Sequence, residues 1–159
     1  MKAIDTVYKG YKFRSRLEAR WAVFLDALDL KWEYEKEGYV LPSGYYLPDF
    51  WISTVNMWAE VKPGDFSQTE YKLAMELVGA TKFPILLLDG TPENRPYFGI
   101  TEPWGAGYEF CLSACYHHDY PHTEHRFFAE PSIDERAWPD TEIAVIAARS
   151  ARFEHGERP

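Results

Sequence analysis

The stretch GYYLPDFWISTVNMWAEVKPG, residues 44–64, carries three charged side chains inside an otherwise apolar and aromatic run. Asp49 follows a proline, and a single valine separates Glu60 from Lys62. The segments YYLPDFWI and MWAEVK have the composition of β-strands, and STVN between them is typical of a turn, so the stretch predicts a β-hairpin. Charged residues are normally excluded from buried strands, so these three require a specific explanation.

The predicted pairing of this hairpin brings two carboxylates together. Pairing Ile52 with Met57 places Asp49 directly across from Glu60, and Lys62 points to the same face as Glu60. Facing carboxylates repel each other unless they share a proton or hold a cation. Mg²⁺ binds carboxylate oxygens, so the pattern favours a divalent-cation site. In such a site the metal ion would polarise a phosphate, and the lysine would hold a water or a phosphate oxygen. The pattern therefore predicts phosphodiester hydrolysis.

A simpler interpretation of the same residues stays open. Glu60 and Lys62 also fit an ordinary ion pair on a solvated sheet face, and a Pro-Asp pair is common in turns. In that case the hairpin would carry no chemistry.

Helical and strand patterns flank the hairpin. Apolar residues at helical spacing predict a helix over residues 15–29, and Ser15 with Glu18 fits a capping box. Residues 31–41, KWEYEKEGYVL, alternate with period two and predict one strand. After the hairpin, Ser67 begins a second helix with a capping box.

That second helix has an apolar face that includes Tyr71, and Gly79 is its expected end. The apolar run at 83–89 predicts a strand buried on both faces, reached by a right-handed crossover. Residues 97–100 predict an edge strand and residues 108–116 a further strand.

The whole pattern predicts one α/β (α+β) domain over residues 1–159, with a mixed central sheet flanked by helices. The element order is helix, three strands, helix, strand, then a variable tail. The core covers about residues 9–90 and an extension residues 91–139. A closing helix covers about residues 140–155, capped by Asp140 and ended at Gly156.

These motifs resemble the PD-(D/E)xK nuclease superfamily, which has the restriction-endonuclease-like fold. The residues that carry the resemblance are Glu18 in RSRLEARWAVFL, Asp49 after Pro48, and Glu60 and Lys62 in WAEVKPG. Within this superfamily the chain resembles small phage and prophage endonucleases, including the endonuclease I type of Holliday-junction resolvase. The resemblance covers residues of about 9–90, just over half of the chain.

The resemblance implies a role for each of these residues. Asp49, Glu60 and the Val61 carbonyl would bind Mg²⁺ or Mn²⁺, and Lys62 would be the catalytic lysine. Glu18 would complete the site by holding a metal-bound water or a second metal, although the capping box alone also explains it.

DNA is the partner that the resemblance implies, in a possible homodimer. The net charge of −8 argues against binding through bulk charge, so local cations must contact the phosphates. Gln68 belongs to a Gln-Tyr pair similar to one in related nucleases, at a shorter spacing. The candidate nucleic-acid contacts are Arg14, Arg16, Arg20, Gln68, Lys72, Arg149 and Arg152. Arginines that serve only solubility are the alternative.

A second metal is also conceivable. Zinc-type ligands gather within fifteen residues at Cys111, Cys115, His117, His118, His122 and His125. They lack a C-x-x-C pair, and Cys111 and Cys115 fall in a strand-like run, so core cysteines and a polar histidine loop are the favoured interpretation. Two further functions therefore remain possible: a non-catalytic nucleic-acid or protein-binding module, and a zinc-stabilised accessory protein. The sequence has no membrane-spanning run and no signal peptide, so we expect a cytoplasmic protein.

Overall fold

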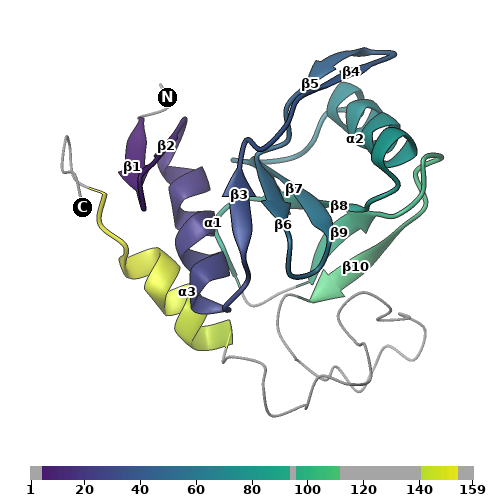
Figure 1. The fold of residues 1–159 in the computed structure, drawn as a ribbon. Helices are drawn as coiled ribbons and strands as arrows, with labels where there is room; N and C mark the ends of the chain where they lie inside the picture. The colour runs from purple at the N-terminus through teal and green to yellow at the C-terminus, as the bar shows by residue number, and fades with distance from the viewer. Residues whose placement is uncertain (1–4, 94–95, 112–140, 154–159) are drawn as a thin grey trace, which may run out of the picture.

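A mixed six-stranded sheet forms the centre of the chain (Figure 1). The computed structural model describes residues 5–93, 96–111 and 141–153. The strands lie in the order β10-β9-β8-β7-β6-β3, and only β7 and β8 pair in parallel. Their bounds are β3 Trp32–Tyr34, β6 Phe50–Ile52, β7 Met57–Lys62, β8 Ile85–Asp89, β9 Pro96–Ile100 and β10 Gly107–Cys111.

Helices cover both faces of this sheet. The helices α1 (Arg16–Ala27) and α3 (Thr141–Ser150) lie together on one face, and α2 (Gln68–Thr81) covers the other (Figure 1). A separate hairpin of β4 (Tyr39–Leu41) and β5 (Gly44–Tyr46) packs against α2. The predicted α+β class is therefore confirmed. No helix in the described ranges is long and apolar enough to cross a membrane.

Strand β7 contributes to both cores because its side chains alternate between the two faces. Met57, Ala59 and Val61 are buried in the core beneath α1 and α3. Trp58 is buried in the core beneath α2. Glu60 therefore lies on the α2 face of the sheet.

Two predicted strands are each divided in the structure, so those predictions were wrong. Residues 31–41 form β3 and β4, which belong to different sheets, and residues 45–52 form β5 and β6. Glu35 has a φ of 45°, which ends the extended backbone after β3. Pro48 separates β5 from β6, because proline has no N–H to donate to a ladder.

An N-terminal hairpin was also missed. Strands β1 (Thr6–Tyr8) and β2 (Tyr11–Phe13) pair across a two-residue turn. Lys9 and Gly10 both have positive φ, at 48° and 83°, as tight hairpin turns require. A Lys-Gly pair between two aromatic strands was the available signal.

The helix α2 runs two residues beyond the predicted stop at Gly79. The left-handed Lys82, with φ 63°, ends it, and its N–H bonds to the Val78 carbonyl. A Cβ at Gly79 would lie 3.1 Å from the Cβ of Pro103, so close packing explains the glycine. Tyr71 was predicted in the apolar face but is 37 % exposed.

The C-terminal part of the chain also departs from the prediction. The helix α3 ends at Ser150 rather than near residue 155, and the Arg20 guanidinium donates to the terminal carbonyls of Ala148 and Arg149. Strand β9 lies between β8 and β10, so it is not an edge strand. Residues 112–116, the predicted loop to 139, Asp140 and Gly156 lie outside the described residues.

Candidate active site

Asp49 and Glu60 meet where the β6–β7 hairpin opens. The observed register pairs Ile52 with Met57 and Phe50 with Ala59, so the predicted register is confirmed. One step further along, Asp49 faces Glu60. Both carboxylates are buried, with only 2 % and 6 % of their surface exposed. Two acidic side chains are thus held together away from water.

Asp49 is satisfied by one partner on each carboxylate oxygen. The Arg14 guanidinium donates from Nη2 to Oδ1 at 2.7 Å. The backbone N–H of Val61 donates to Oδ2 at 2.8 Å. The second contact fixes the carboxylate against β7, so its orientation depends on the ladder geometry of the hairpin.

Glu60 is likewise held by two donors. The Lys62 ammonium lies 3.0 Å from Oε1 and also contacts Glu70, at 3.2 Å. The Tyr46 hydroxyl donates to Oε2 at 3.1 Å. Tyr46 comes from β5, so the separate hairpin closes one side of the site. Glu70 belongs to the capping box of α2, which places that helix's first turn beside Lys62.

The electrostatics of the pair match its burial. Burial raises the pKa of Asp49 well above its usual range, and the charges of Glu60 and Glu18 raise it further, against the lowering effects of the Val61 N–H and Arg14. Burial also raises the pKa of Glu60, although Lys62 and Tyr46 act in the opposite direction. Ionising both groups is therefore unfavourable without an additional cation.

The neighbouring donors keep their protons. Burial opposes the charge on Lys62, but the carboxylates of Glu60 and Glu70 outweigh it and raise its pKa. Burial and the charge of Glu60 raise the pKa of Tyr46. At neutral pH Lys62 is thus a cation, suited to holding an anionic oxygen rather than to accepting a proton.

Glu18 lies at the first turn of α1, near this pair. It is buried, and its carboxylate accepts hydrogen bonds from the Ser15 hydroxyl, the Arg14 N–H and the Tyr34 hydroxyl. Ser15 caps the helix as predicted, but the return bond of the capping box goes to the N–H of Arg14. Glu18 therefore takes part in the helix cap and also lies close enough to Asp49 to affect its pKa.

Of the predicted nucleic-acid contacts, only Arg14 directly touches the carboxylate pair. Arg20 binds the end of α3. Gln68 and Lys72 are exposed on α2, which covers the same face as Glu60. Arg149 lies in α3 beside Glu93, at 3.8 Å, whereas Arg152 follows the end of that helix. Arg152 therefore does not share a face of α3 with Arg149.

Arg16 is half-buried, and its Nε has no hydrogen-bond partner.

The donor set suits a hard divalent cation. Mg²⁺ is commonly held by one or two carboxylates while it keeps several waters. Asp49 and Glu60 supply such a pair, and an added cation would relieve the repulsion that raises their pKa values. In the described part of the chain, no three Asp, Glu, His or Cys side chains are grouped as a complete metal site. Glu18 thus does not form a ready third ligand.

The zinc hypothesis is not addressed by this geometry. Cys111 ends β10, and Cys115, His117, His118, His122 and His125 lie outside the described residues.

Three participants in the site were missed from the sequence. Tyr46 and Tyr34 donate hydrogen bonds to Glu60 and Glu18, and Glu70 shares Lys62. Glu70 lies three residues after Ser67, so the capping-box pattern explained it and gave no sign of its contact with Lys62. Nothing in the local pattern around either tyrosine distinguished it from a core aromatic.

No protein-family model, curated protein or solved structure matches the chain. The relationship to the PD-(D/E)xK superfamily therefore stays a prediction made from the sequence.

Proposed function

We propose that the chain is a divalent-metal-dependent endonuclease that hydrolyses phosphodiester bonds in DNA. The observation that carries this proposal is the buried pair of Asp49 and Glu60, facing each other beside the protonated Lys62. Burying two carboxylates that repel each other costs stability. A hydrolytic site gains from this arrangement, because a divalent cation between them can act on phosphate.

The arrangement of the elements supports a restriction-endonuclease-like core. With the β4–β5 hairpin set aside as an insertion, the central elements follow the order α1, β3, β6, β7, α2 and β8. The first three of these strands are antiparallel, and α2 connects β7 to the parallel β8. The candidate site then lies where the second and third strands diverge. The agreement of this element order and site position with a restriction-endonuclease-like core is the basis for proposing a PD-(D/E)xK relationship.

Each side chain has a distinct task in the proposed reaction. A bound Mg²⁺ or Mn²⁺ would supply Lewis acidity and a bound water of lowered pKa. Asp49 and Glu60 would hold the cation, with the Val61 backbone fixing the orientation of Asp49. The Lys62 ammonium would hold a phosphate oxygen and screen charge that develops on it. Glu18 would orient water from the α1 side.

We further propose that DNA structure, rather than base sequence, selects the substrate. The candidate cations are Arg14 and Lys62 at the site and the exposed Lys72 on α2, which suit phosphate oxygens. Phosphate contacts position a nucleic acid but read no bases. A homodimer would place two such sites on two strands of a branched substrate.

The direct test is cleavage of labelled linear, nicked and branched DNA, with matched RNA, in the presence and absence of Mg²⁺ or Mn²⁺. We expect metal-dependent cleavage that is fastest on branched DNA. The isosteric variant Glu60→Gln is the matched control for a contaminating nuclease. Equal cleavage by this variant, or no cleavage of any substrate with metal present, would overturn the proposal.

One observation favours a second candidate, a non-catalytic binding module. All four carboxylate oxygens of Asp49 and Glu60 already have a protein donor. Such a network can be structural without any metal. Titration with Mn²⁺ separates the two functions, because a purely structural network would bind no Mn²⁺. The titration of the Asp49→Asn variant would then be the same as that of the wild type.

A further inference from the structure

Arg14 occupies the position where a cation is needed. Its Nη2 lies 2.7 Å from Asp49 Oδ1, and its Nε lies 2.7 Å from Glu35 Oε1. The side chain thus bridges the buried carboxylate of the candidate site and a second, half-buried carboxylate. A point charge at this place lowers the pKa of Asp49, as a metal ion would do more strongly.

The donors around the pair differ in their freedom to move. The Val61 N–H belongs to β7, and Tyr46 is buried with 9 % exposed surface. Lys62 is held by two carboxylates, with 31 % of its side chain exposed. The Arg14 side chain is 57 % exposed. Of the groups that touch Asp49, only Arg14 can leave without disturbing the sheet.

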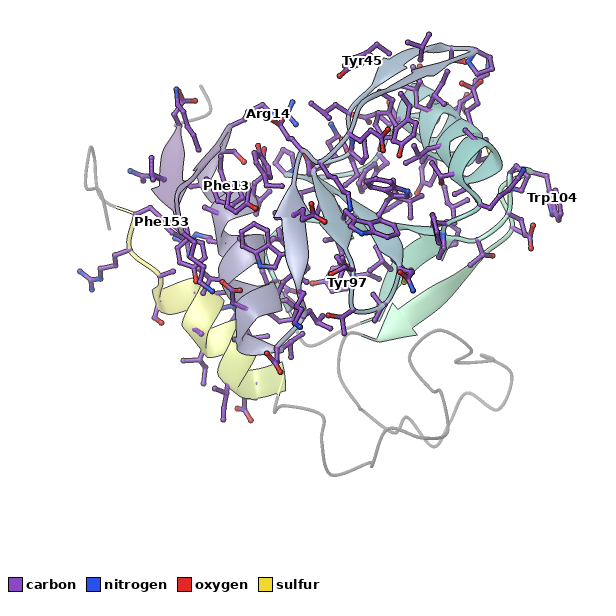
Figure 2. All side chains as sticks on the ribbon, viewed as in Figure 1. Phe13, Arg14, Tyr45, Tyr97, Trp104 and Phe153 are labelled. Carbon is purple, nitrogen blue, oxygen red and sulfur yellow. The ribbon has the colours of Figure 1, made fainter. Side chains whose placement is uncertain are left out.

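The backbone N–H of Arg14 is anchored by two hydrogen bonds, and the side chain reaches one of the same acceptors only at 3.5 Å, from Nε to the Tyr34 hydroxyl. Its N–H donates to Glu18 Oε2 at 3.2 Å and to the Tyr34 hydroxyl at 3.1 Å. Figure 2 shows Arg14 between the N-terminal hairpin and the end of β3. The guanidinium can therefore swing while its Cα stays fixed beside the site.

We propose that Arg14 is a movable phosphate ligand: it neutralises Asp49 in the metal-free protein, and it passes to a phosphate of the nucleic acid when a divalent cation takes its place on Asp49. This inference rests on the proposed function. It assigns to one side chain both the stabilisation of the metal-free site and a substrate contact that exists only after metal binding.

An arginine suits both positions better than a lysine would. The planar guanidinium carries five donors, so it spans Asp49 and Glu35 at once, and it binds phosphate in a bidentate manner. Once a cation neutralises Asp49, the attraction that holds Arg14 there is reduced, and the incoming phosphate provides a new anion at close range. Metal binding and nucleic-acid binding therefore become coupled through this residue.

Calorimetric titration with Mn²⁺ tests the first half. Arg14→Gln should bind Mn²⁺ about threefold to tenfold more tightly than the wild type, because the ion no longer displaces a competing cation from a partly exposed pair. Arg14→Lys, which keeps the charge but cannot span both carboxylates, should fall between them. The matched control is Lys12→Gln, which removes an exposed cation paired with Asp5.

Nucleic-acid binding tests the second half. In Ca²⁺, Arg14→Gln should reduce the salt slope of DNA binding by about one unit relative to Lys12→Gln, since one phosphate contact is lost. With EDTA the two variants should bind DNA equally, because Arg14 is then held by Asp49. Both titrations use the full chain, and circular dichroism checks folding.

The outcomes separate this inference from the proposed function. A wild type that binds no Mn²⁺ overturns the proposed function and this inference together. A wild type that binds Mn²⁺, with Arg14→Gln unchanged or weaker, overturns the role of Arg14 alone. Equal loss of DNA affinity with and without Ca²⁺ also overturns it. Unfolding of both Arg14 variants would also overturn the role of Arg14, because a side chain that is free to move cannot be required for folding.

Discussion

The two faces of β7 share one backbone but have opposite energetics. On one face, Met57 and Ala59 lie fully buried among apolar side chains beneath α1 and α3. On the other, Glu60 and Lys62 place charges at the border of the second core, where burial raises the pKa of the glutamate. The two charged side chains of β7 thus both lie on the even-numbered face, which also buries Trp58, whereas the odd-numbered face is apolar. The comparison predicts that substitutions on the two faces have separable effects.

The largest expected effect is on activity, from the charged face. Glu60→Gln and Lys62→Ala should each reduce DNA cleavage by at least about 10²–10³-fold, the usual cost of losing one electrostatic group of an active site. The fold should persist. Initial rates on labelled branched DNA, together with thermal unfolding, measure both properties.

The exposed pair of Glu33 and Lys36, 2.8 Å apart, provides matched controls. Glu33→Gln and Lys36→Ala remove the same charges outside the site and should leave cleavage within about twofold, because exposed pairs contribute little. Wild-type rates for the Glu60 or Lys62 variants would contradict the assignment.

The next effect is on stability, from the apolar face. Met57→Ala should lower the free energy of unfolding by about 2–5 kcal/mol, because a fully buried side chain leaves a cavity. Met57→Leu, which nearly conserves volume, should cost less than about 1.5 kcal/mol. Urea denaturation measures both. An alanine variant as stable as the leucine variant would show that this face is not close-packed.

The affinity for metal comes third. Asp49→Asn keeps the shape of the side chain and its bond from the Val61 N–H but removes the charge. Mn²⁺ should bind at least about tenfold more weakly, which corresponds to about 1.4 kcal/mol. An unchanged calorimetric isotherm would mean that the metal is held elsewhere in the chain.

The sequence could predict which side chains of β7 share a face. A β-strand alternates by necessity, and a four-residue turn with Asn56 in the left-handed region fixed the register at Ile52 and Met57. The position of Asp49 across from Glu60 followed from that register. The helices α1 and α2 were predicted for the same reason, since their caps and periodicity are local.

The donors to the carboxylates could not be predicted in this way. Tyr46 reaches Glu60 only because β4 and β5 leave the central sheet and pack on α2. Arg14 reaches Asp49 across thirty-five positions, through the placement of an N-terminal hairpin that was itself missed. Such contacts depend on tertiary packing, for which the sequence near either residue carries no signal.

The pH dependence of stability should also distinguish the two faces. The folded-state pKa values of Asp49 and Glu60 are raised, so their contribution to stability is fully present below the unfolded-state pKa of about 4 and is lost as pH rises through the folded values. Each pH unit that separates the folded pKa from the unfolded pKa corresponds to a loss of about 1.4 kcal/mol. The double variant Asp49→Asn/Glu60→Gln should therefore gain stability relative to the wild type between acidic and neutral pH.

Urea denaturation at a series of pH values, in EDTA, measures this difference. Added Mn²⁺ should cancel it, because the cation stabilises the ionised pair only in the wild type. If the difference in free energy of unfolding between the two proteins is the same at every pH, burial does not raise the pKa values of the two carboxylates.

The smallest expected effect concerns where the DNA backbone passes. Lys72 is exposed on α2, on the face of the sheet that bears Glu60, whereas Arg149 and Arg152 lie in and just after α3, which covers the opposite face. In Ca²⁺, Lys72→Ala should flatten the salt dependence of DNA binding by about 0.9 units, and Arg149→Ala/Arg152→Ala by up to about two, if each contacts one phosphate. Both losses should be the same on all sequences, because phosphate contacts read none. A DNA that follows only the charged face of β7 would respond to Lys72 alone. A slope that changes only with the arginine pair would instead place the backbone along the α1–α3 side, where Arg20 already joins the two helices.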